Sequence, residues 1–172
     1  MNVIETHRLI LREFLGADST ALINIFADEK VMHYGETVRG EPWIQAWIQD
    51  MQTSYRARGY GNWAIVTKKT MTCIGYCGLS FAPSLDGQSE VALGYRLAQA
   101  HWNLGYATEA VKATLNYGLR KLSLPSIVAM IDPANLASIC VAEKVGMVHE
   151  KDVMLDWYTH PDHLYRIDLA GF

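Results

Sequence analysis

The chain has 172 residues, half of them apolar, and a formal net charge of −3. This length suits one domain with a full core, and no apolar run approaches the ~20 residues that a membrane span needs. The acidic balance argues against nucleic-acid partners. The first residues lack a basic-then-apolar signal pattern, so we expect a cytoplasmic protein that binds neither nucleic acid nor membrane.

The three cysteines predict neither a disulfide framework nor a metal site. Cys73 and Cys77 lie four residues apart on one expected strand, which is too far for them to bridge. Cys140 is expected to be a small buried residue of a helix.

The first half of the chain mixes strand patterns with two amphipathic helix patterns. In chain order, we expect a strand at 8–14, helices at 19–27 and from Pro42 to Gly59, a strand pair at 62–67 and 73–82, and a turn at 84–88. Asp18 is placed to cap the first of these helices. Pro42 suits the first turn of the second, and Gly59 and Gly61 end it.

The second half has the order strand, helix, strand, helix, and then a pair of strands. We expect strands at 91–97, 126–131, 147–157 and 164–169, and helices at 108–122 and 136–144. Residues 126–131 are almost entirely apolar, which is typical of a buried parallel strand. Because no linker or repeat interrupts the pattern, the chain reads as one mixed α/β domain.

A small-residue turn joins the expected strand at 91–97 to the helix at 108–122. Gly105 and Ala107 leave the backbone uncovered where the helix begins. Unpaired amides and the helix dipole at such a turn favour a bound phosphate. The P-loop pattern is excluded because no Lys follows Gly105, and the dinucleotide pattern is excluded because two of its three glycines are missing.

The segment 102–107 resembles the coenzyme A pyrophosphate loop of GNAT N-acetyltransferases, whose pattern is Gln/Arg-x-x-Gly-x-Gly/Ala. Gly105 and Ala107 match this pattern, and Trp102 departs from it at the first position. The following Thr-Glu-Ala is typical of the branch that holds the ribosomal-protein N-terminal (serine/alanine) acetyltransferases. Asn135, Ser138 and Gly146 match a second motif of that branch.

The resemblance implies the GNAT fold over the whole chain, residues 1–172. This is a mixed, mostly antiparallel α/β sheet with helices on both faces and two central parallel strands, here 91–97 and 126–131, splayed apart. The pantetheine arm of acetyl-CoA, the implied co-substrate, would enter the gap between these strands. The implied cofactor contacts are Tyr95, Arg96, Leu97, Trp102, Asn103, Leu104, Gly105, Tyr106, Ala107, Thr108, Asn135 and Ser138.

Acetyl transfer to an amine needs a neutral nitrogen, a donor for the carbonyl oxygen and a proton or hydrogen bond for the leaving thiolate. Most relatives supply a Tyr to the sulfur, but the helix at 136–144 has none, so Ser138 takes that place by resemblance. For the general base, Glu90, Asp156 and a water chain remain open. Met32, Tyr34, Trp43 and Trp63 are expected to line the acceptor pocket.

The sequence is therefore interpreted as an acetyl-CoA-dependent N-acetyltransferase that acylates a protein N-terminus or a small-molecule amine directly. We expect no covalent enzyme intermediate and no metal, in a monomer or a homodimer. A non-catalytic acyl-CoA sensor and a transferase that uses another donor, such as succinyl-CoA, remain as alternatives.

Overall fold

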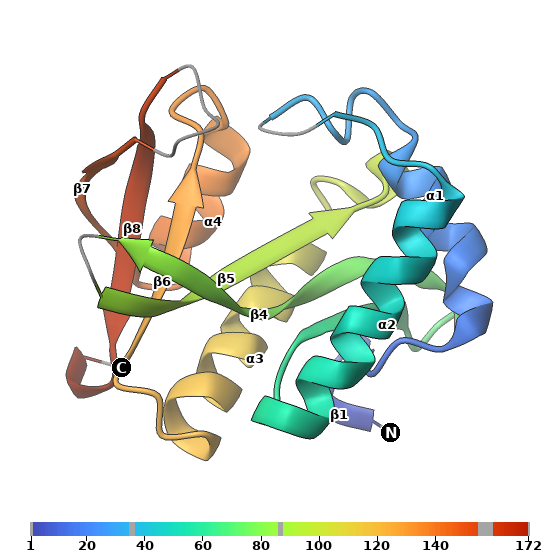
Figure 1. The fold of residues 1–172 in the computed structure, drawn as a ribbon, viewed down its shortest axis with the longest axis horizontal. Helices are drawn as coiled ribbons and strands as arrows, with labels where there is room; N and C mark the ends of the chain where they lie inside the picture. Colours follow the sequence, from blue (N-terminus) through green and yellow to red (C-terminus); the bar gives the residue numbers. More distant parts are fainter. Residues whose placement is uncertain (1, 35–36, 86–87, 155–159, 172) are drawn as a thin grey trace.

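An eight-stranded sheet with the strand order β1-β2-β3-β4-β5-β6-β8-β7 organises the computed structural model (Figure 1). The structure describes residues 2–34, 37–85, 88–154 and 160–171. The strands are β1 (Asn2–Glu5), β2 (Leu9–Arg12), β3 (Asn62–Thr67), β4 (Cys73–Leu85), β5 (Gln88–Leu97), β6 (Ser126–Ile131), β7 (Val148–Val153) and β8 (Asp162–Asp168). The main helices are α1 (Ser19–Phe26), α2 (Glu41–Arg58), α3 (Tyr106–Asn116) and α4 (Leu136–Lys144).

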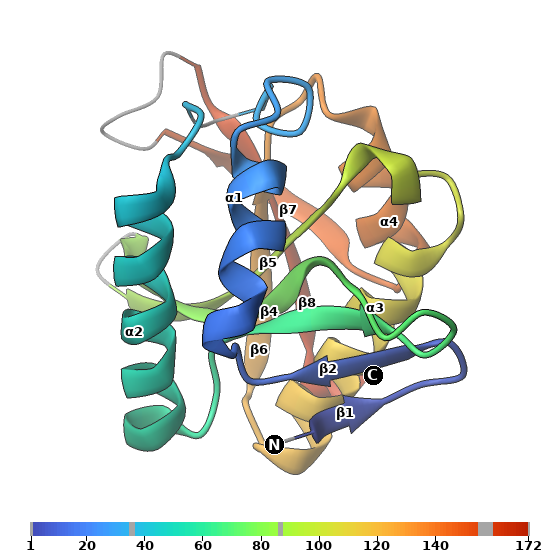
Figure 2. The same ribbon diagram turned by 90° about the vertical axis from the view of Figure 1, so that its right-hand side faces the viewer.

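Helices cover both faces of the sheet, as predicted. Figure 2 shows α1 and α2 on one side of the strands and α3 and α4 on the other. Two apolar clusters fill these layers, one between the sheet and α1 and α2, the other beneath α3 and α4. β3 lies between the layers and is buried at every position, which is why its sequence shows no apolar alternation. Within the described ranges, no helix has both the length and the apolarity to cross a bilayer.

The centre of the sheet contains the predicted parallel pair, β5 and β6. Within the described residues, these strands meet at a single register pair, Ala92 opposite Val128. Beyond it β5 stays paired with β4, and β6 stays paired with β8, so the two strands diverge towards their carboxyl ends (Figure 1). The inner edges of both strands therefore face a gap instead of each other.

Several local expectations needed correction. β1 was not expected, and β2 is shorter than the pattern at 8–14. Asp18 does not cap α1. Its carboxylate accepts a hydrogen bond from the Leu15 amide (2.7 Å) and pairs with Arg12 (2.7 Å), because the chain turns back before the helix begins. α3 begins two residues earlier than expected, at Tyr106, and ends in a π-helical turn, Tyr117–Lys121.

The expectation that Cys140 is buried was also wrong, because its side chain is exposed on α4. The helical period points Ser138, Val141 and Ala142 inward, which leaves position 140 on the outer face. Gly59, with φ of 76°, ends α2 as predicted, and Pro42 lies in the first turn of that helix.

The close approach of β3 to β4 generates the first prediction. Gly78 pairs with Asn62 of β3, and a Cβ at position 78 would overlap the backbone of Gly61 and Asn62. Because backbone atoms cannot rotate away, Gly78→Ala should lower the free energy of unfolding by about 1–3 kcal/mol, measured by urea denaturation. Gly16→Ala, with no atom within 4 Å of its new Cβ, should change it by less than about 0.5 kcal/mol. Equal stability of the two variants would contradict this account.

Candidate functional site

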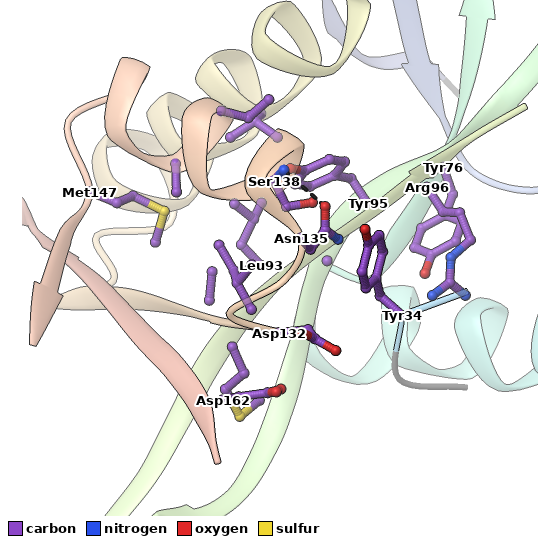
Figure 3. Close-up of a pocket in the computed structure, with 17 residues that line it drawn as sticks. Tyr34, Tyr76, Leu93, Tyr95, Arg96, Asp132, Asn135, Ser138, Met147 and Asp162 are labelled. Carbon is purple, nitrogen blue, oxygen red and sulfur yellow. Dashed lines mark hydrogen bonds between the residues drawn. The ribbon is translucent and has the colours of Figure 1, made fainter. Parts of the chain in front are cut away.

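A cavity of about 220 Å³ lies where β5 and β6 diverge (Figure 3). Its walls are residues 93–96 of β5, residues 129–131 of β6 and the inward side of α4. Tyr34, from the segment after α1, closes another side. The cavity therefore occupies the gap that the resemblance assigned to the end of a pantetheine arm.

The turn between β6 and α4 presents polar groups to this cavity. The Asn135 Oδ1 atom accepts a hydrogen bond from the Ser138 amide at 3.1 Å, so Asn135 is the N-cap of α4. One residue after β6, the Asp132 Oδ1 atom accepts a hydrogen bond from the Ala134 amide at 2.7 Å. Asp132, Asn135 and Ser138 all line the cavity, so this single turn sets the positions of three polar side chains.

Tyr95 reaches the same end of the cavity from β5. Its hydroxyl is buried and faces the Ser138 side chain, although not in the geometry of a good hydrogen bond (Figure 3). Burial raises the pKa of Tyr95 to about 12, and the neighbouring Ser138 acts in the opposite direction. The structure thus brings a second hydroxyl to Ser138, from a residue that the sequence placed only among the cofactor contacts.

The glycine-bearing turn has the backbone conformation of an anion site. Asn103 (φ 58°) and Gly105 (φ 77°) are both left-handed, and Gly105 is the N-cap of α3. The Glu109 amide donates to the Gly105 carbonyl at 3.1 Å and closes the first turn. The helix therefore offers no acceptor to the amides of residues 106–108, which point outward at its positive end.

Arg8, which the sequence analysis missed, braces this turn. Its Nη1 donates to the Leu104 carbonyl (2.9 Å), its Nε pairs with Glu109 (2.6 Å), and its guanidinium lies 4.5 Å from the centroid of the Tyr106 ring. Burial raises the pKa of Glu109, but hydrogen bonds from Thr6 and Arg8 outweigh this and hold that pKa below its ordinary value. An ionised Glu109 thus anchors a cation beside the candidate anion site.

Of the two acids expected as the general base, the structure describes Glu90, and its carboxylate is engaged by Arg166 outside the cavity. Both carboxylate oxygens of Glu90 face Arg166, at 2.8 and 3.3 Å, and Glu90 does not line the cavity. Arg166 also donates to Glu150 and to the Ser126 hydroxyl, so Glu90 belongs to an ion-pair network across the strands. Asp156 lies outside the described residues.

Of the four residues expected around the acceptor, Tyr34 lines the cavity. Trp63 is 1 % exposed and packs on Tyr117 in the core beneath α3, and Met32 is 3 % exposed in the core beneath α1 and α2. Trp43 stacks on Trp47 with ring centroids 5.7 Å apart. Most of these residues therefore pack in the core, and only Tyr34 of the four lines the cavity.

Among the expected cofactor contacts, Tyr95, Arg96, Asn135 and Ser138 line the cavity. Leu97 is buried, and its carbonyl accepts a hydrogen bond from the Trp102 indole at 2.9 Å. This bond ties the start of the turn to the end of β5. Trp102 therefore has a structural role at the position where the family pattern has Gln or Arg.

Asp132 and Asp162, both in the cavity lining, were also missed. Asp132 follows the carboxyl end of a parallel strand, a position that often carries ligand contacts and that could have marked it. Asp162 and Arg8 carry no local signal, because the pairing of β8 with β6 and the contact of Arg8 with Glu109 join distant segments of the chain.

The comparisons with known proteins agree with this geometry. Residues 8–148 match the model of the acetyltransferase (GNAT) domain, so the chain belongs to the GNAT family of N-acetyltransferases. An uncharacterized Bacillus subtilis protein, YkkB, is 34 % identical over 86 % of each chain. A GNAT-family acetyltransferase from Bacillus anthracis is 26 % identical, with a TM-score of 0.82 over 97 % of this chain and 98 % of its own.

A ribosomal L7/L12 alpha-N-protein acetyltransferase, RimL, solved in complex with coenzyme A, has the same fold at 16 % identity. Its TM-score is 0.80 over the full length of both chains. The family model confirms the predicted family, and the structural likenesses confirm the predicted fold.

The capping of α4 gives a prediction for the site. Asn135→Ala removes the acceptor for the Ser138 amide and should lower the free energy of unfolding by about 1 kcal/mol, measured by urea denaturation. Asn135→Asp keeps an acceptor oxygen and should retain most of the stability. If the Ala variant were as stable as the Asp variant, the cap would not hold this turn.

Proposed function

We propose that the protein transfers the acetyl group of acetyl-CoA directly to a primary amine, either a protein N-terminus or a small molecule. The observation that carries this proposal is the cavity between the diverging strands, which Val111 of α3 also lines. The left-handed Gly105 turn lies at the start of that same helix. The pyrophosphate would bind residues 103–108. The pantetheine arm would pair with the inner edge of β5, which would place the thioester near Tyr95 and Ser138.

In this arrangement, the amides along the free edge of β5 serve as donors to the thioester oxygen as negative charge develops on it. The Ser138 hydroxyl donates a hydrogen bond to the leaving thiolate, and the buried Tyr95 hydroxyl supports Ser138. The short helix that holds Ser138 is fixed by its cap, which limits the motion of this donor.

Direct attack by the amine agrees with the state of the buried thiols. Burial raises the pKa of Cys73 to about 11 and that of Cys77 to about 12, so neither is a ready nucleophile at neutral pH. Neither of them lines the cavity, whereas the amine can reach the thioester there without an enzyme-bound intermediate.

The activity is tested by incubating the purified protein with acetyl-CoA and following thiol release. The acceptor panel should contain n-butylamine, 1,4-diaminobutane and short peptides with free Ser or Ala N-termini. Succinyl-CoA in place of acetyl-CoA tests the choice of donor. Thiol release that requires an amine supports transfer, and tight acetyl-CoA binding without release on any acceptor would favour a sensor instead.

The cofactor loop is tested at Gly105. Gly105→Glu would add an anion where the pyrophosphate should lie and should weaken acetyl-CoA binding at least tenfold, measured by calorimetry. Gly105→Ala is the matched control, because it carries the same strain from the positive φ without the charge. Equal affinity in the two variants would show that the phosphates bind elsewhere.

The sulfur site is tested by Ser138→Ala, which should lower kcat by about 10- to 100-fold with little change in acetyl-CoA affinity. Tyr95→Phe removes the buried hydroxyl beside Ser138 and should lower kcat by a smaller factor. Steady-state kinetics with the best acceptor of the panel measures both. Full turnover in Ser138→Ala would leave Ser138 with a role in the helix turn only.

A further inference from the structure

We propose that Asp132 and Asp162 form the acceptor end of the cavity, where they bind the acceptor as an alkylammonium ion, and that Asp162 removes its proton. This inference rests on the proposed function and names the base and the charge of the substrate. The two carboxylates come from neighbouring strand ends, since Asp132 follows β6 and Asp162 begins β8. Both point into the cavity on the side away from Ser138 (Figure 3).

Asp162 is a buried carboxyl group with an unsatisfied oxygen. Its residue is 3 % exposed, and its Oδ1 atom has no hydrogen-bond partner among the described residues. A charged group in that state costs free energy unless a ligand compensates it, and a cationic amine carries the N–H donors that this oxygen lacks. The Asp162 Oδ1 atom can therefore accept a hydrogen bond from an ammonium group.

The groups around Asp162 set how readily its carboxylate takes a proton. Burial raises the pKa of Asp162 first, the charge of Asp132 raises it further, and His160 and His163 oppose the shift. Asp132 is held in place by the Ala134 amide (2.7 Å) and by His160, whose Nε2 lies 3.5 Å from its Oδ2. The Asp132 carboxylate is thus held in one position, and the Asp162 carboxylate beside it has a raised pKa, as a proton acceptor requires.

The proton balance follows from this placement. The acceptor enters as R–NH₃⁺ and gives one proton to the Asp162 carboxylate, which leaves a neutral nitrogen. That nitrogen attacks the thioester carbonyl and forms the C–N bond, and the C–S bond then breaks. The second proton leaves the nitrogen and ends on the departing sulfur, and Asp162 later releases its proton to solvent. The products are the acetylamide, coenzyme A and one proton.

This assignment predicts a defect that depends on the basicity of the acceptor. Asp162→Asn should lower kcat/KM for n-butylamine or 1,4-diaminobutane at least 100-fold at pH 7, because these amines are protonated there. The loss should shrink as the pH approaches the pKa of the amine. It should also be much smaller for O-propylhydroxylamine, which is already neutral at pH 7 and needs no base.

The companion variant separates binding from proton removal. Asp132→Asn should raise KM for the alkylamines about tenfold, as expected for a lost charge-assisted contact, with a smaller effect on kcat. Calorimetry of 1,4-diaminobutane with the coenzyme A complex gives a readout apart from turnover, and either variant should weaken that binding. Asp168→Asn, an exposed position at the other end of β8, is the control and should match the wild type.

The melting temperature gives a second test, which distinguishes a functional Asp162 from one that only stabilises the fold. A native pKa above the unfolded value means that the folded state holds the proton more tightly, so stability falls as pH rises through that range. The neutral Asp162→Asn should therefore unfold at pH 7 at a melting temperature no lower than that of the wild type. If the Asn variant were less stable than the wild type, Asp162 would have a structural role instead of the proposed one.

The outcomes distinguish this inference from the proposed function. Acetyl-CoA binding and amine-dependent thiol release that persist in both Asp variants would overturn the acidic acceptor site and leave the transferase intact. A wild-type coenzyme A complex that binds no alkylammonium would likewise overturn the inference. Absence of acetyl-CoA binding by the wild type would instead refute the proposed function.

Discussion

The site depends on the point where two parallel strands stop pairing. Within the described residues, β5 and β6 meet at one register pair, Ala92 opposite Val128, and beyond it β5 stays paired with β4 and β6 with β8. The backbone N–H and C=O groups of a sheet normally form hydrogen bonds with the neighbouring strands. Where β5 and β6 separate, these groups need other hydrogen-bond partners. α3 and α4 lie on the same side of the sheet, and both contribute to the cavity at this opening, α3 through Val111 and the start of α4 through Asn135 and Ser138 (Figure 2).

The two ends of the cavity differ in chemistry because different strands build them. Hydroxyl groups from Tyr95 and Ser138 gather near α4, and carboxylates gather where β6 ends and β8 begins. A leaving thiolate needs a hydrogen-bond donor, and an ammonium ion needs a hydrogen-bond acceptor. The hydroxyl groups at one end of the cavity and the carboxylates at the other therefore suit the two reactants of the proposed transfer. The antiparallel pairing of β6 with β8 is what brings Asp162 beside Asp132, across about 30 residues of chain.

Local chemistry in the sequence was sufficient for most of the helices and strands and for the small-residue turn that precedes α3. The left-handed backbone at Gly59 and Gly105 is one that glycine adopts without strain, and the Asn135 side chain caps a helix as asparagine commonly does. The helix boundaries next to these residues lie within two residues of the predicted ones. Asp18 misled because its carboxylate had a stronger partner, Arg12, than the helix amides. Contacts between charged residues that sheet pairing brings together could not be predicted. Neither the ion pair of Glu90 with Arg166 nor the burial of Asp162 is indicated by the spacing of nearby residues.

The brace between Arg8 and Glu109 also bears on how the protein is made. It joins positions 101 residues apart, so the chain must close a long loop before the turn at the start of α3 is held. Contacts of this range form late, and during synthesis the N-terminal strand emerges long before its partner helix. A partly made chain thus lacks a braced turn at the start of α3, and formation of the Arg8–Glu109 pair would mark the moment at which the two halves of the domain have docked.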